Sequence, residues 1–303
     1  MTGLIVFGRA KPPPAATAIT DPFSDNNDST LPELRRYLAR DGTQLSFREY
    51  PVDGRQVAVL IHGSAGSSND MHRLAMALQS AGVAALVPDL RGHGSNRPHG
   101  DIEYAGQLDD DIADFLAKEK PRFPHSVWTA VGFSSGAAFA LRISAEIPLG
   151  KSFDRYIFVS PYLRYNAPSV RPAGSGTASW AAASTGRIIG LTILNAIGVH
   201  LWDGLPVLAF PVPPHMDSAT QTYSWRMQKN FGAHDDYLAD IRSAARPVQV
   251  FVGSADQLLD ADKLRIEFQS QRRDVGVIII PGLGHSGMVT DPAAIRAIVA
   301  SFQ

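Results

Sequence analysis

Residues 126–136 read SVWTAVGFSSG and contain the pattern Gly-x-Ser-x-Gly at 132–136, which occurs once in the chain. The first part of the stretch is an apolar run typical of a buried strand, and residues 135–147 read as a helix that Pro148 stops. A serine at the centre of such a strand-turn-helix junction projects its hydroxyl beyond the carboxyl edge of the sheet. Its neighbours must be small because strand and helix crowd together there. The pattern therefore predicts a nucleophile at Ser134.

Short apolar runs and amphipathic segments alternate on both sides of this junction. We expect strands at 56–62, 84–90, 126–133, 155–160, 247–253 and 275–280. We expect helices at 70–82, 104–118 and 135–147, and again after each of the last two strands. Apolar strands that alternate with helices are typical of a parallel sheet covered on both faces, so the fold class is α/β. Within the helix 104–118, the acidic residues 109–111 are expected to face solvent.

The alternation fails between Ser160 and Ala245, where about 85 residues show no convincing strand pattern. Since a loop that long is unusual in a compact domain, we expect a helical cap at 162–244, inserted into a core formed by 31–161 and 245–303. Its apolar run at 188–202, IIGLTILNAIGVHLW, is expected to face the pocket of Ser134. Residues 1–30, which include Pro12 to Pro14, are expected to form a flexible arm.

A serine nucleophile needs a base, and the base needs an acid that orients it. Of nine histidines, only His285 follows the last expected strand, in the glycine-rich segment PGLGH. Asp256 lies just past the end of the strand 247–253 and is the expected acid. Its rival is Asp260, which we interpret as the N-cap of the next helix.

Acyl transfer also needs two hydrogen-bond donors for the developing oxyanion. One is expected to be the backbone N–H of Ser135, which follows the nucleophile. The other is expected to be the backbone N–H of Ser64, in the segment HGSAG that follows the strand 56–62. The sequence leaves open whether the Ser64 side chain adds a donor or is solvated.

Other polar clusters are interpreted as structural. Asp89 and His93 belong to DLRGHG, which predicts a tight glycine turn held by buried hydrogen bonds, and 234–236 (His-Asp-Asp) is expected to be a solvated stretch. The chain has no cysteine, which excludes a disulfide scaffold, a thiolate metal site and a cysteine nucleophile. Its net charge of −1 does not favour a nucleic-acid partner. No metal and no cofactor are expected.

Targeting signals are weak. The apolar run 4–7 is too short for a secretory segment, and polar residues interrupt the apolar region 188–210. We therefore expect no transmembrane helix and a cytoplasmic location. A start codon further upstream would instead allow export or membrane anchoring.

Several stretches together resemble the α/β-hydrolase superfamily. These are RDGTQL at 40–45, LIHG at 60–63, VPDLRGHG at 87–94, VGFSSG at 131–136, GSAD at 253–256 and GLGH at 282–285. The chain is most similar to the serine aminopeptidase S33, monoacylglycerol lipase and lysophospholipase-like branch, of Hydrolase_4 type, over roughly 35–160 and 245–303. The resemblance implies a mostly parallel central sheet with helices on both faces and a helical cap inserted after the sixth strand. It also implies the catalytic triad Ser134, Asp256 and His285, with Ser64 and Ser135 as oxyanion donors.

The leading functional hypothesis is a serine hydrolase that cleaves small-molecule carboxylic esters with apolar acyl groups. An aminopeptidase of the proline-iminopeptidase kind is the first alternative, and it would need carboxylates in the cap to hold a free ammonium group. The second alternative is a ligand receptor on a hydrolase scaffold with weak turnover. The sequence leaves both alternatives open.

Overall fold

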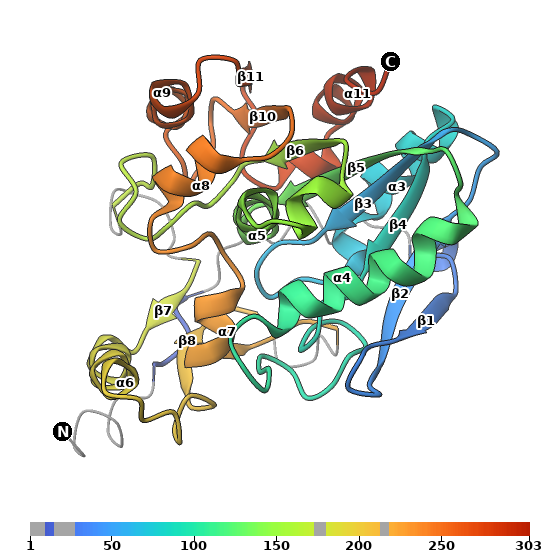
Figure 1. Cartoon of the computed structure of the whole chain (residues 1–303). Helices are drawn as coiled ribbons and strands as arrows, with labels where there is room; N and C mark the ends of the chain where they lie inside the picture. The colour runs from blue at the N-terminus through green and yellow to red at the C-terminus, as the bar shows by residue number, and fades with distance from the viewer. Residues whose placement is uncertain (1–9, 15–27, 173–179, 213–217) are drawn as a thin grey trace.

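A central sheet of eight strands organises the chain, and the computed structural model describes residues 10–14, 28–172, 180–212 and 218–303 (Figure 1). The order across the sheet is β1-β2-β4-β3-β5-β6-β10-β11. The pairs from β4 to β11 are all parallel, whereas β2 is antiparallel to both of its neighbours. The strands are β1 (Leu34–Leu38), β2 (Gln44–Tyr50), β3 (Gln56–Ile61), β4 (Ala84–Pro88), β5 (Val127–Phe133), β6 (Arg155–Val159), β10 (Val248–Gly253) and β11 (Gly276–Ile280). The predicted α/β class with a mostly parallel sheet is confirmed.

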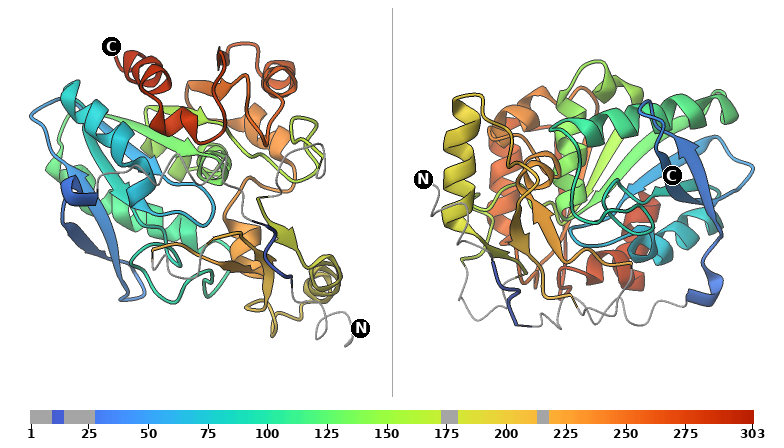
Figure 2. Two further views of the ribbon diagram at one scale, coloured as in Figure 1. Left: turned by 180° about the vertical axis from the view of Figure 1, so that it is seen from behind. Right: turned by 90° about the horizontal axis from the view of Figure 1, so that it is seen from below.

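Helices cover both faces of the sheet (Figures 1 and 2). The first face packs against α4 (Gln107–Glu119), α5 (Ser135–Ala145) and α9 (Ala261–Gln271). The second packs against α3 (His72–Ser80), α10 (Gly287–Thr290) and α11 (Pro292–Ala300). Short 3-10 turns lie at Asp28–Thr30, Ser68–Met71, Lys120–Arg122 and Leu149–Ser152. Each predicted helix is present, with ends shifted by a few residues.

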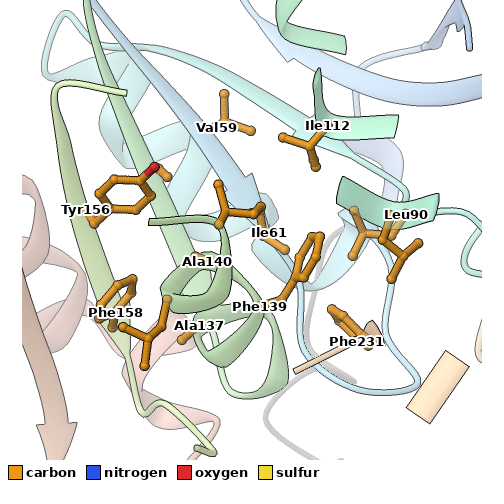
Figure 3. Close-up of a cluster of buried hydrophobic side chains, with 14 of the residues drawn as sticks. Val59, Ile61, Leu90, Ile112, Ala137, Phe139, Ala140, Tyr156, Phe158 and Phe231 are labelled. Atoms are coloured by element: carbon orange, nitrogen blue, oxygen red, sulfur yellow. The ribbon is translucent and has the colours of Figure 1, made fainter. Parts of the chain in front are cut away.

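The strand β3 shows how the sequence builds this layered core. Val59 and Ile61 pack into the cluster on the first face, whereas Ala58 and Leu60 pack into the cluster on the second face. Successive side chains of a strand point to opposite faces, so a continuous apolar run is buried on both. Figure 3 shows part of the first cluster, in which Phe139 of α5 lies beside Ile61.

The antiparallel hairpin of β1 and β2 was not among the expected strands. The sequence of β1, LRRYL, contains two arginines, and only Tyr37 of this strand is buried. Leu34 and Leu38 are exposed. The strand β1 lies at the edge of the sheet, where charged side chains are common because they discourage pairing with another chain. Its sequence therefore lacks the apolar pattern of an interior strand.

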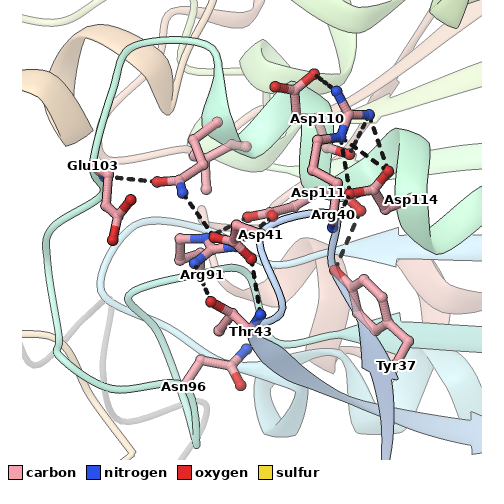
Figure 4. Close-up of polar contacts among 12 residues, drawn as sticks. Tyr37, Arg40, Asp41, Thr43, Arg91, Asn96, Glu103, Asp110, Asp111 and Asp114 are labelled. Atoms are coloured by element: carbon pink, nitrogen blue, oxygen red, sulfur yellow. Dashed lines mark hydrogen bonds and ion pairs between the residues drawn. The ribbon is translucent and has the colours of Figure 1, made fainter.

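The acidic residues of α4 do not all face solvent, and the expectation for 109–111 was wrong for two of them. Asp109 and Asp111 are buried. Arg142 donates to Asp109 over 2.9 Å, and Arg91 holds Asp111 with two hydrogen bonds of 2.8 Å (Figure 4). A buried carboxylate is tolerated when a cation and hydrogen bonds compensate for its lost hydration. Sequence periodicity cannot show those partners, because they come from distant segments.

We call the chain between β6 and β10 the cap, and its last helix packs against α5 and α9 of the core. The cap contains α6 (Thr185–Ala196), α7 (Trp225–Asn230) and α8 (Tyr237–Ser243). It also contains an unexpected antiparallel sheet of β7 (Ala182–Ala183), β8 (Pro206–Ala209) and β9 (Thr222–Ser224). Strands of two to four residues are too short to leave an alternating pattern, which explains why only helices were expected there.

The apolar run at 188–202 does not face the pocket of Ser134, so that expectation was wrong. One side of α6 packs against the cap through Leu191 and Leu194, which contact Val207 of β8 and Trp225 of α7. The other side is exposed and carries Ile189, Ile193 and Ile197. The run has two apolar faces, and only one of them has a partner in the described part of the chain. In Figure 2, α6 lies at the outer edge of the cap, away from the central sheet.

The expected N-terminal arm at 1–30 lies largely outside the described residues. Across the described ranges, no helix combines the length and the apolar character that a membrane span requires.

Candidate active site

The turn after β5 places Ser134 in a strained conformation. Its φ is +55°, in the left-handed region that non-glycine residues rarely adopt. The two glycines of the motif are required by close approach: a Cβ at Gly132 would lie 2.4 Å from the Gly136 oxygen, and one at Gly136 would lie 2.2 Å from the His62 oxygen. Strain of this kind persists where the surroundings enforce it, and such positions cluster at functional sites.

Three side chains meet at the carboxyl edge of the sheet. Ser134 follows β5, Asp256 follows β10 and His285 follows β11, so the parallel strands deliver all three to the same edge. His285 Nε2 lies 2.9 Å from Ser134 Oγ, and His285 Nδ1 lies 2.8 Å from Asp256 Oδ2. All three residues are buried. The structure thus brings together the three residues that the sequence grouped, while their chemical roles stay predictions.

The surroundings of Asp256 favour its ionised form. Burial by itself would raise the pKa of this carboxyl, but the His285 imidazole and the backbone N–H of Leu258 outweigh it and hold the pKa below its usual range. The N–H groups of Leu258 and Leu259 donate to Asp256 Oδ1 over 2.9 and 3.0 Å. An ionised carboxylate can only accept hydrogen bonds. His285 therefore donates from Nδ1, which leaves Nε2 to accept the hydrogen bond of the Ser134 hydroxyl.

Asp260, the rival acid, has the structural role that the sequence predicted. Its side chain accepts a hydrogen bond from the Lys263 N–H over 3.1 Å and caps the N-terminus of α9.

The loop at 62–66, which follows β3 and is here called the β3 loop, lies beside Ser134. The Gly63 carbonyl accepts hydrogen bonds from His62 Nδ1 over 2.9 Å and from the Gly66 N–H over 3.3 Å. Because a trans peptide is planar, fixing that carbonyl turns the N–H of Ser64 in the opposite direction. Neither the Ser64 N–H nor the Ser135 N–H has an acceptor among the described residues.

The side chains of Ser64 and Ser135 contact each other. Their hydroxyl oxygens lie 2.5 Å apart and share a hydrogen bond. The Ser64 hydroxyl is therefore not simply solvated, because it connects the β3 loop to the first turn of α5.

A cavity of about 80 Å³ opens over Ser134 and His285. Its apolar wall combines core and cap residues: Phe133, Leu258, Trp180, Val212 and Ala219. Its polar side contains several serines and one carboxylate, Asp70. Sequence analysis missed Asp70 and all of the cap residues, because only tertiary structure places them beside the serine. A larger, arginine-rich cavity of about 280 Å³ beside β2 contains none of the three grouped residues.

The other polar clusters divide into one confirmed and one corrected interpretation. Asp89 accepts from the N–H groups of Ser68 and Ser95 over 2.7 and 3.0 Å, which confirms a turn held by buried hydrogen bonds. In the stretch 234–236, Asp235 and Asp236 are exposed as expected, but His234 pairs with Asp240 over 2.8 Å and with Glu146, which follows α5, over 3.1 Å.

Comparison with known proteins matches a model of the alpha/beta hydrolase family to residues 58–298. A monoacylglycerol lipase of Mycolicibacterium smegmatis is 30% identical over 123 residues, which are 37% of this chain and 43% of the lipase. The match therefore spans less than half of that relative. The 30 kDa subunit of magnesium chelatase from Rhodobacter capsulatus is 23% identical over 80% of this chain and 87% of its own length.

The solved structure of a soluble variant of the monoglyceride lipase from Saccharomyces cerevisiae superposes with a TM-score of 0.66. It covers 91% of this chain and 94% of the lipase chain at 18% identity. At that identity the likeness concerns the fold.

Proposed function

The chain belongs to the alpha/beta hydrolase family, and from this premise we propose that it is a serine hydrolase that cleaves carboxylic esters of apolar acyl groups. The observation that carries the proposal is the buried hydrogen-bond series from Asp256 through His285 to Ser134, with distances of 2.8 and 2.9 Å. A nucleophile bonded to a base, with the base held by a carboxylate, is the arrangement that activates a serine hydroxyl.

In the proposed reaction, Ser134 Oγ attacks the acyl carbon while His285 Nε2 takes the hydroxyl proton. The carbonyl oxygen becomes an oxyanion, which the N–H groups of Ser64 and Ser135 stabilise. His285 then returns the proton to the departing alcohol as the carbon–oxygen bond breaks, which leaves an acyl-enzyme. Water, deprotonated by His285, attacks this ester, and the collapse of the second oxyanion releases the acid and restores Ser134.

The cavity supports the substrate class. Its apolar wall, which includes Trp180 and Val212, fits an acyl chain. No arginine or lysine is among the described residues that line it. The substrate therefore needs no anionic group for recognition.

Asp70 is the observation that favours the aminopeptidase alternative. Its carboxyl lines the cavity and could bind an ammonium group. Its Oδ2 already accepts from the Ser67 N–H over 3.2 Å, and burial raises its pKa to about 7. At neutral pH the carboxyl is therefore only partly ionised, which makes it a weaker partner for a cation than an ordinary carboxylate.

Turnover of short p-nitrophenyl esters beside alanine and proline anilides tests the proposal. Ester hydrolysis that is faster than every anilide supports it. Anilides that outperform every ester would favour the aminopeptidase. A serine that reacts with a fluorophosphonate in a protein that turns over neither class would favour the receptor.

A further inference from the structure

We propose that Tyr223, a residue of the cap, is a positioning residue that holds the β3 loop in the conformation that presents the Ser64 N–H to the oxyanion. This inference rests on the proposed function. It concerns a contact between the cap and the core that the roles proposed for Ser134, Asp256 and His285 do not include.

The β3 loop needs an external partner because of Ala65. This residue follows Ser64 directly and has a φ of +62°, in the left-handed region that carries an energetic penalty for alanine. Surrounding structure must compensate for such a conformation if it is to persist.

The cap supplies that partner at both polar groups of Ala65. The Ala65 N–H donates to the Tyr223 hydroxyl over 2.7 Å, and the Ala65 carbonyl accepts from the Thr220 N–H over 2.9 Å. Both cap residues belong to the segment that forms β9 or directly precedes it. The backbone of one strained loop residue is therefore held from two sides by cap residues that lie more than 150 positions away in the sequence.

The Tyr223 hydroxyl is itself fixed by a buried histidine. His93 Nε2 lies 2.6 Å from the hydroxyl oxygen, and His93 Nδ1 lies 3.0 Å from the Arg91 carbonyl. Burial holds the pKa of His93 well below its usual range, so the ring is neutral and has one N–H. That N–H donates from Nδ1 to the carbonyl, and Nε2 accepts the proton of Tyr223.

The chemistry of Tyr223 fits this double role. Burial raises its pKa above the usual range, so the phenol keeps the proton that it donates to His93. Its oxygen lone pairs then accept from Ala65. Hydrogen bonds therefore connect His93 to Tyr223 and Tyr223 to Ala65, which is adjacent to Ser64. Through them, the position of the cap on the core determines the geometry of the oxyanion donor.

Tyr223→Phe tests the inference, because it removes one oxygen and keeps the ring. Losing an oxyanion donor outright costs roughly 10²–10³ in kcat, so a displaced donor should lower kcat by roughly 10- to 100-fold. KM should stay within about twofold, since the acyl wall of the cavity is unchanged. Rates are normalised to active sites titrated with a fluorophosphonate, so partial unfolding cannot imitate the effect.

Two variants serve as controls. Tyr156→Phe removes another buried phenol hydroxyl, which donates to the Gly150 carbonyl over 3.0 Å outside the cavity. Arg226→Gln breaks the paired contact of the cap with Asp101, at 2.7 and 2.8 Å, without touching Ala65. Both should lower the melting temperature and leave kcat close to that of the wild type.

The outcomes separate the two proposals. A selective loss of kcat in Tyr223→Phe supports positioning by the cap. An unchanged kcat, or an equal loss in Arg226→Gln, would overturn it while leaving the proposed function intact. A wild-type protein without ester turnover would instead contradict the proposed function.

Discussion

His285 Nε2 lies 2.9 Å from Ser134 Oγ, although 151 positions separate the two residues in the chain. The distance is short because β5 and β11 run parallel and end at the same edge of the sheet. A neutral imidazole at this distance from the hydroxyl can take up the serine proton, which is the role that we propose for His285.

Replacing Asp256 with Asn should lower kcat by roughly 10⁴, because an amide no longer enforces the imidazole tautomer that accepts a proton at Nε2. Asp260→Asn is the matched control, since asparagine is also a good N-cap and α9 keeps its first-turn hydrogen bond. Steady-state kinetics of both variants on one short ester decide the matter. A larger loss in the Asp260 variant would mean that the orienting acid has been misassigned.

Acyl-chain preference should follow the size of the cavity. The sequence suggested a pocket lined by the run 188–202, but that run lies elsewhere and the cavity measures about 80 Å³. At ~10–15 Å³ for each water-sized sphere, it accommodates about six small groups. We expect kcat/KM on p-nitrophenyl esters to rise by up to about fourfold per methylene, to peak near C4–C6, and to fall by C12.

Trp180→Ala should move that optimum to longer chains, because the indole forms part of the apolar wall. A wild-type optimum at long chains, or an optimum that does not move in Trp180→Ala, would contradict the proposal that the apolar wall of this cavity binds the acyl chain.

The contact between the cap and α5 should become less stable at alkaline pH. Asp240, and then Glu146, raise the pKa of His234 to about 9, above the value of ~6.5 expected in the unfolded chain. A raised pKa in the folded state means that the stabilisation is complete below pH ~6.5 and is lost as the pH rises through 9. His234→Gln should therefore lower the melting temperature at pH 6 but have little effect at pH 10. An equal loss at both pH values would show that the charge of His234 does not matter.

The sequence predicted the parts of the molecule that local chemistry determines. Gly132 is required by backbone contacts within one strand-turn-helix junction, and Gly136 by the backbone at the end of the neighbouring strand β3, so their spacing reveals Ser134. Asp256 and His285 follow from their positions after strands. These features depend on neighbours in the chain or on strand order alone.

The features that sequence analysis missed depend on distant partners. The contact of Tyr223 with Ala65 joins positions 158 apart, and nothing in the local sequence around Tyr223 indicates it. The cap strands are too short to show periodicity, and β1 buries a single side chain, that of Tyr37. The prediction for 188–202 was wrong because an apolar helix face has the same sequence pattern whether it is buried or exposed.

The most direct test of the central claim is peptide mapping by mass spectrometry after brief reaction with a fluorophosphonate, together with ester turnover of Ser134→Ala and Ser135→Ala. We expect one label per chain, on Ser134. The Ser134 variant should not be labelled. Its turnover should fall to the residual rate that substrate binding and the oxyanion donors alone provide. The Ser135 variant should keep both, because its proposed donor is a backbone N–H. A label on Ser135, or full labelling of Ser134→Ala, would contradict the assignment of Ser134 as the nucleophile.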